Sequence, residues 1–127
     1  METDRDKLNA ITELIIGCAY QVSNALEVGF LEKVYENSLA HELRKHGLLV
    51  KQQEPVTVMY DGVDVGKYFA DLLIADGVIV EVKTVKALDD IHMAQCMNYL
   101  KATGLRICIL LNFHETRVGI KRIVNNF

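Results

Sequence analysis

Two carboxylates and a lysine near the middle of the sequence are spaced so that they could act together on a substrate. Asp71 lies within one apolar run, and Glu81 and Lys83 end the next one. Both runs are rich in β-branched residues, which predicts two strands, and Asp76-Gly77 between them is a strong turn signal. Side chains alternate along a strand, so Glu81 and Lys83 share a face, and a hairpin can bring Asp71 beside them.

The chemistry open to such a group is metal-assisted hydrolysis. Carboxylate and carbonyl oxygens suit Mg²⁺ or Mn²⁺, and a divalent ion can activate water for phosphodiester cleavage. The alternative is a solvated charge pair, which is the usual role of Glu-x-Lys on a strand. Glu81 and Lys83 end a run that is typical of a buried central strand, where a charge is costly unless it is paired or metal-bound. On these residues alone, both interpretations stay open.

Length and composition predict a single globular domain, residues 1–127, of which half are hydrophobic and 24% are charged. No apolar run approaches membrane-spanning length, and the N-terminal segment is charged rather than signal-like, so we expect a cytoplasmic protein without membrane contact. The cysteines are odd in number and lie in apolar patterns, which predicts reduced core thiols at Cys18, Cys96 and Cys108.

The charge balance does not indicate a nucleic-acid partner. The formal net charge is −3, whereas a protein that binds nucleic acid is expected to have a basic stripe on its surface. Two local basic groups exist, Arg44-Lys45-His46 with Lys51, and Arg117 with Lys121-Arg122. Either group could contact phosphate, but solvated surface is the commoner role of such residues and is the interpretation we favour.

Three segments with apolar residues at helical spacing would flank the strands. They predict a first helix from a cap at Thr3 or Asp4 to about Leu26, and further helices over residues 31–46 and 91–103. Four strands are predicted between the second and third helices, at residues 48–53 and 56–60 and in the runs that carry Asp71 and Glu81. A further strand is predicted at residues 105–111, and residues 117–124 form a final edge strand or a tail. The order α-α-β-β-β-β-α-β-β is typical of an α/β fold with a mixed sheet and flanking helices.

Polar groups on the second and third predicted helices could also face the carboxylates. Glu32 and Tyr35 are three apart at the start of the second helix, where an acid also favours the helix dipole by up to about 1 kcal/mol. On the third helix, His92, Gln95 and Tyr99 share one face, and Tyr99 could simply pack in the core with the other two at its rim. Taken alone, these residues favour the simpler roles.

Taken in this order, the motifs resemble the PD-(D/E)XK nuclease superfamily, whose core is restriction-endonuclease-like. The similarity is closer to a small bacterial family, the GxxExxY proteins, whose naming motif fits residues 29–35. Asp71 followed by Glu81-Val82-Lys83 resembles the nuclease core, although the superfamily's proline before the first acid is Ala70 here. A Gln-x-x-x-Tyr pattern on the third helix resembles the exonuclease-type branch, and the resemblance runs from about residue 11 to residue 124.

The resemblance implies a role for each of these residues. Asp71 and Glu81, helped by the Val82 backbone carbonyl, would hold Mg²⁺ or Mn²⁺, and Glu32 would complete the acidic cluster from the helix side. Lys83 would orient or polarise the attacking water, or stabilise the charge that develops on the phosphate.

Gln95 and Tyr99 would then position Lys83 or a substrate phosphate. The first hypothesis is a metal-dependent nuclease acting on DNA, and less readily on RNA, with a homodimer as a possible way to pair two active sites. The second is a PD-(D/E)XK-fold binding or accessory module in a complex, with the acids retained but no turnover, because a fold alone does not fix a function.

Overall fold

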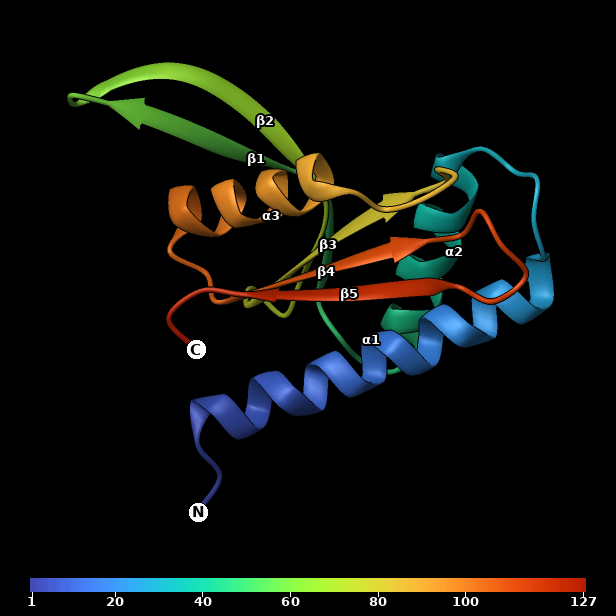
Figure 1. Ribbon diagram of the computed structural model, residues 1–127. Coiled ribbons are helices and arrows are strands. Elements are labelled where there is room, and N and C mark those ends of the chain that lie inside the picture. The colour runs from blue at the N-terminus through green and yellow to red at the C-terminus, as the bar shows by residue number, and fades with distance from the viewer.

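The computed structural model describes all residues 1–127 and has an α/β architecture (Figure 1). Its elements are α1 (Asp4–Leu26), α2 (Glu32–Lys45), β1 (Val50–Tyr60), β2 (Val63–Ile74), β3 (Val78–Lys83), α3 (Asp90–Thr103), β4 (Ile107–Asn112) and β5 (Gly119–Val124). The predicted fold class and the succession of helices and strands are confirmed. In detail, three strands rather than four separate α2 from α3, because residues 48–53 and 56–60 contribute to one strand.

The sequence predicts a break between residues 53 and 56, at Pro55, but this proline does not end the strand. It pairs with Phe69 of β2 in the middle of an eleven-residue strand. The sheet order is β1-β2-β3-β4-β5, so β1 is an edge strand. A proline has no backbone N–H to donate. On an edge strand that position can face solvent, where no neighbouring strand requires the hydrogen bond.

The sheet is mixed and covered on both faces. Strands β3 and β4 are parallel, and every other neighbouring pair is antiparallel. Helix α3 connects β3 to β4 and packs on one face, whereas α1 and α2 cover the other (Figure 1). The first five residues of β3 are all buried, which explains why they are apolar apart from Glu81.

One hairpin extends beyond the rest of the sheet (Figure 1). β2 pairs with β3 only over Leu72–Val80, Leu73–Ile79 and Ile74–Val78, so that the earlier part of β2 has β1 as its only partner strand. We call residues 54–70 the hairpin arm. Its large exposed apolar side chains are Met59, Tyr60, Val63, Val65, Tyr68 and Phe69.

Local signals fix the ends of α1 and α3, and Thr3 is one of the two caps that the sequence predicts for the first helix. Thr3 caps α1 and Asp89 caps α3, each through a reciprocal capping box. Gly104 ends α3 in the left-handed conformation, at φ 76°. The three cysteines are free and buried, as expected, and no helix has the length and apolar character that crossing a membrane requires.

Candidate metal and catalytic site

Asp71 and Glu81 meet where β2 separates from β3. Beyond the last strand pair, Leu72–Val80, side chains take over the hydrogen bonds of the ladder. The Asp71 N–H donates to Glu81 Oε2 at 2.7 Å, and the Val82 N–H donates to Asp71 Oδ2 at 2.8 Å. Each carboxylate is therefore fixed by the backbone of the opposite strand, which places the two predicted acids side by side.

Burial sets the electrostatics of this pair. The Glu81 side chain is only 3% exposed, and its burial, together with repulsion from Asp71, raises the pKa of Glu81 to about 8. Burial also raises the pKa of Asp71, against hydrogen bonds from Val82 and Gln53 that favour the charged form. Two buried acids that repel each other are unstable as two anions unless a cation is nearby.

Lys83 is a cation whose charge acts on both acids, but it does not neutralise the pair. Its charge lowers the pKa of both Asp71 and Glu81, so it lies within electrostatic reach of them. It forms no ion pair: the salt bridges of the structure join other residues. Its carbonyl oxygen accepts a hydrogen bond of 2.8 Å from the Phe113 N–H, which holds the end of β3 against the segment after β4.

Glu36 is a third buried acid near the pair, and the sequence analysis did not identify it as a site residue. It is 3% exposed and lies on the buried face of α2. Its oxygens accept hydrogen bonds from Gln52 at 2.7 Å, Gln53 at 2.8 Å and Lys33 at 2.9 Å. Its charge contributes to raising the pKa of both Asp71 and Glu81, so the acids form one electrostatic unit.

Gln53 connects Glu36 to Asp71. Its Nε2 donates to Glu36 at 2.8 Å and to Asp71 Oδ1 at 3.2 Å. Its backbone has φ 54°, a left-handed conformation that is costly for a residue with a side chain, by about 1–3 kcal/mol. Gln53 is left out of the β1–β2 pairing, although Gln52 and Glu54 on either side keep the same register. Only the weak signal of a polar Gln-Gln pair in a strand could have pointed to it.

The structure separates the roles of the three motif residues at the start of α2. Gly29 has φ 108°, a conformation suited to glycine. The Tyr35 hydroxyl donates to the Glu27 carbonyl at 2.7 Å, and its ring stacks on Phe113 at 4.7 Å. These two residues therefore hold the loop between α1 and α2 in shape.

Glu32 faces the cleft that contains Asp71. Its Oε2 accepts a hydrogen bond of 3.0 Å from the Thr84 N–H. Both residues line a cleft of about 470 Å³ together with Asp71, Glu36 and Gln53. No group of three or more His, Cys, Asp or Glu side chains is close enough together to hold a metal, so a role for Glu32 as a ligand stays a prediction.

Tyr99 and Gln95 approach from α3, on the other face of the sheet. Tyr99 is 5% exposed, and burial followed by the charges of Glu81 and Asp71 raises the pKa of its phenol. Tyr99 is therefore near the pair and stays protonated. Gln95 lines an adjoining groove of about 590 Å³ with Tyr99 and Tyr68, whose rings are 6.0 Å apart.

The donor set at Asp71 and Glu81 fits a small, hard divalent ion. Mg²⁺ is commonly held by one or two carboxylates, with water and substrate oxygens completing its coordination. The raised pKa values of both acids indicate that the site is short of positive charge. The Val82 carbonyl, between Glu81 and Lys83 in the chain, would be a further oxygen ligand of the right kind.

Comparisons with known proteins bear on the fold and the superfamily. No curated protein matches the chain in sequence. The crystal structure of SSO0001 has a TM-score of 0.55 at 20% identity, covering 75% of this chain and 50% of that chain. The alkaline exonuclease LHK-Exo from Laribacter hongkongensis has a TM-score of 0.56 at 13% identity, covering 99% of this chain and 73% of that one. At such identities the likeness shows a shared fold, and this chain spans half the length of SSO0001. A family model described as the PD-(D/E)XK nuclease superfamily matches residues 9–123, nearly the whole chain, and the protein therefore belongs to that superfamily.

Proposed function

We propose that the protein is a metal-dependent nuclease that hydrolyses phosphodiester bonds in DNA rather than RNA. The observation that carries this proposal is the buried pair Asp71 and Glu81, whose pKa values are both raised beside a lysine that has no acidic partner. Such a pair costs stability in the free protein, and a functional site is where that cost is commonly retained.

The residues divide the chemistry between them. Asp71, Glu81 and the Val82 carbonyl would hold Mg²⁺ or Mn²⁺, which when bound lowers the pKa of a coordinated water and offsets charge on the phosphate. Gln53 fixes Asp71 Oδ1, which limits the rotation of that carboxylate. The Lys83 ammonium can donate a hydrogen bond to the attacking water or to a phosphate oxygen as negative charge develops there.

The neighbouring polar residues would orient the substrate. Tyr99 keeps its proton because its pKa is raised, so it can donate a hydrogen bond to a phosphate oxygen and cannot act as a base. Gln95 would position Lys83 or the same phosphate from the adjoining groove. Glu32 would complete the acidic cluster if its carboxylate left the Thr84 N–H.

The proposal is tested by incubating the purified protein with single-stranded, double-stranded and branched DNA, and with RNA, in the presence of Mg²⁺ or Mn²⁺. The matched control is Glu81→Gln, which removes the charge and keeps an oxygen to accept from the Asp71 N–H. We expect cleavage by the wild type only with the ion present and none by the variant. Equal cleavage by both proteins would show that Glu81 is not part of the active site.

We infer that the chain belongs to the GxxExxY branch of the superfamily. This inference is supported by Gly29 and Tyr35 of the motif, which both hold the loop before α2 in shape. We also infer a reducing, cytoplasmic location, in support of which all three thiols are free and buried.

The second candidate function is a non-catalytic module that binds another protein or a second copy of this chain. The hairpin arm favours it, because six large apolar side chains are exposed there. The arm also carries three acids, Glu54, Asp61 and Asp64, against the single base Lys67, and this balance suits a protein surface better than a phosphate backbone. Absence of cleavage of every substrate would favour this alternative.

A further inference from the structure

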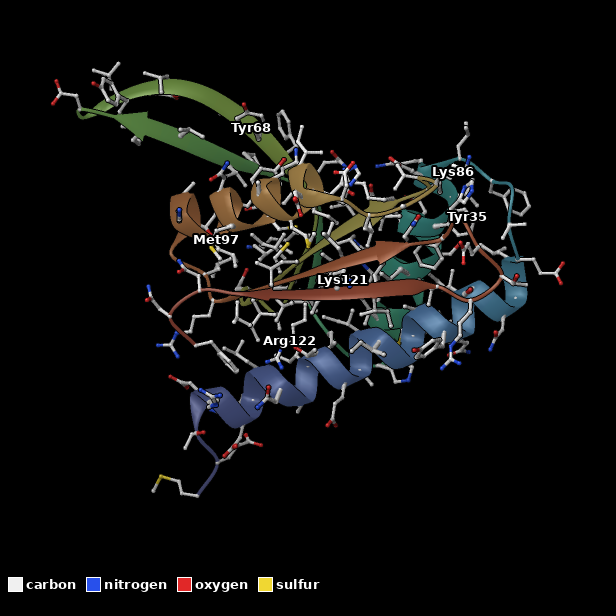
Figure 2. All side chains as sticks on the ribbon, in the orientation of Figure 1. Tyr35, Tyr68, Lys86, Met97, Lys121 and Arg122 are labelled. Carbon is white, nitrogen blue, oxygen red and sulfur yellow. The ribbon has the colours of Figure 1, made fainter.

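A small basic pocket lies outside the carboxyl ends of the two parallel strands. It has a volume of about 260 Å³, and its basic residues are Lys86, Arg117 and Lys121. Lys86 lies on the loop after β3, and Lys121 lies on β5 (Figure 2). In open α/β sheets, the crevice beyond the carboxyl ends of the strands is a common place for ligands.

The charges of this pocket are not neutralised within the protein. None of the three basic residues forms a salt bridge. The pocket contains one acid, Glu115, so its local balance is positive in a protein whose formal net charge is −3. An anion is therefore the ligand that the pocket favours.

Two contacts give the pocket a defined shape. The Arg117 guanidinium lies over the Tyr20 ring, 5.2 Å from its centre. The buried Asn112 accepts from the Val85 N–H at 3.0 Å and donates to the Val85 carbonyl at 2.8 Å, which fixes the loop that carries Lys86. Lys86 is thus presented by a braced loop, Arg117 by the loop between β4 and β5, and Lys121 by the edge strand β5.

The pocket is adjacent to the metal and catalytic site. Thr84 lines the acidic cleft, and Lys86, two residues later on the same loop, lines the basic pocket. Three residues of chain span at most about 11 Å, so the Cα atoms of Lys83 and Lys86 lie within that distance.

We propose that Lys86, Arg117 and Lys121 form a subsite for a phosphate group of the nucleic-acid strand whose scissile bond lies at Asp71 and Glu81. The inference rests on the proposed nuclease function and names a contact that the reaction itself does not require. The phosphate is either a terminal monophosphate or an internal diester near the cleaved bond, because both present the same anionic oxygens.

Binding without cleavage tests the subsite. Fluorescence anisotropy in EDTA would measure the affinity of labelled single-stranded oligonucleotides at several salt concentrations. The probes carry a 5′-phosphate, a 3′-phosphate or no terminal phosphate. The variant is Lys86→Gln with Lys121→Gln, and Arg117→Gln is measured separately.

The matched control is Lys7→Gln with Arg106→Gln. These two residues line a hollow of about 320 Å³ on the side where β4 begins, and the control changes the net charge equally. All the substituted side chains are exposed, so we expect the variants to fold.

We expect the pocket variants to bind roughly tenfold more weakly, as for the loss of a charge-assisted contact. Their slope of log affinity against log salt should fall by about 0.7, the value for one phosphate of a single strand. A loss confined to one phosphorylated probe identifies a terminal phosphate, and an equal loss on all three identifies an internal one.

Equal weakening by the control, or unchanged binding by the pocket variants, would overturn the subsite. A wild type that binds none of the probes would overturn it as well. Cleavage by the wild type with Mn²⁺ is measured separately, so failure of the nuclease proposal is distinguishable from failure of the subsite.

Discussion

Among single residues, we expect Glu81 to have the largest effect on how the stability of the metal-free protein depends on pH. Its pKa is raised from 4.5 to about 8 in the folded state. Below the lower value the carboxyl is protonated in both states. As the pH rises towards 8, the unfolded chain releases the proton and the folded protein keeps it, so stability is lost.

We therefore predict that the melting temperature of the wild type in EDTA falls between pH 5 and pH 8. The free energy of unfolding should decrease by an amount on the order of a few kcal/mol. Glu81→Gln has no such proton to lose and should give a flatter profile. Thermal melts at the two pH values measure this, and parallel profiles for both proteins would contradict it.

The two acids should respond differently to amide substitution. A glutamine at position 81 can still accept from the Asp71 N–H. An asparagine at position 71 cannot serve both of its partners, because the Val82 N–H and the Gln53 amide are both donors. We expect Asp71→Asn to melt several degrees below Glu81→Gln in EDTA.

Millimolar Mn²⁺ should raise the melting temperature of the wild type, because an ion at a hundred times its dissociation constant stabilises the folded state by about 2.7 kcal/mol. Both amide variants should lose most of this response. If they respond as the wild type does, the ion binds elsewhere.

At the scale of elements, helix ends could be predicted because their signals are local. Thr3 and Asp89 cap helices through residues within one turn of themselves. The extent of β1 could not be predicted, since Pro55 is tolerated only because β1 is at the edge of the sheet. The hairpin that joins Asp71 to Glu81 was predictable from its turn, but the left-handed backbone of Gln53 was not.

The same division explains what was missed in the site. Glu36 is on the buried face of α2, yet its partners Gln52 and Gln53 come from β1, and no local pattern in the sequence connects these elements. Likewise, the pocket at Lys86 and Lys121 joins residues that are 35 positions apart.

The motif tyrosine of α2 gives a prediction at this scale. Tyr35→Phe keeps the stacking on Phe113 but leaves the Glu27 carbonyl without its hydroxyl donor. The expected cost is about 1–3 kcal/mol, seen as a fall in melting temperature of several degrees. Metal affinity and the cleavage rate at low temperature should stay close to the wild type. Loss of cleavage with unchanged stability would mean instead that the hydroxyl takes part in catalysis.

At the scale of the whole molecule, the outer part of the hairpin arm, residues 58–66, is the part least needed by the core. Thr57 and Lys67 face each other in the β1–β2 ladder, so residues 58–66 can be replaced by an Asn-Gly turn. We expect the shortened protein to fold and to melt within a few degrees of the wild type, because the deleted residues lie outside both buried clusters.

The full chain should sediment as a dimer at micromolar concentration if the exposed apolar side chains of the arm bind a second copy, and the shortened chain as a monomer. Sedimentation velocity on both proteins decides this. A shortened chain that still dimerises would place the contact elsewhere.

The hydrogen bonds at the end of the β2–β3 ladder have a kinetic consequence. The Asp71 and Val82 amides are protected from solvent exchange by the same two carboxylates that would bind the ion. An ion bound to those oxygens would weaken the hydrogen bonds that they accept from the two amides, and both amides would then exchange faster. These amides lie where the arm leaves the sheet. Deuterium uptake at these two positions should therefore report site occupancy directly, and the arm should be held less firmly when the site is loaded than when it is empty.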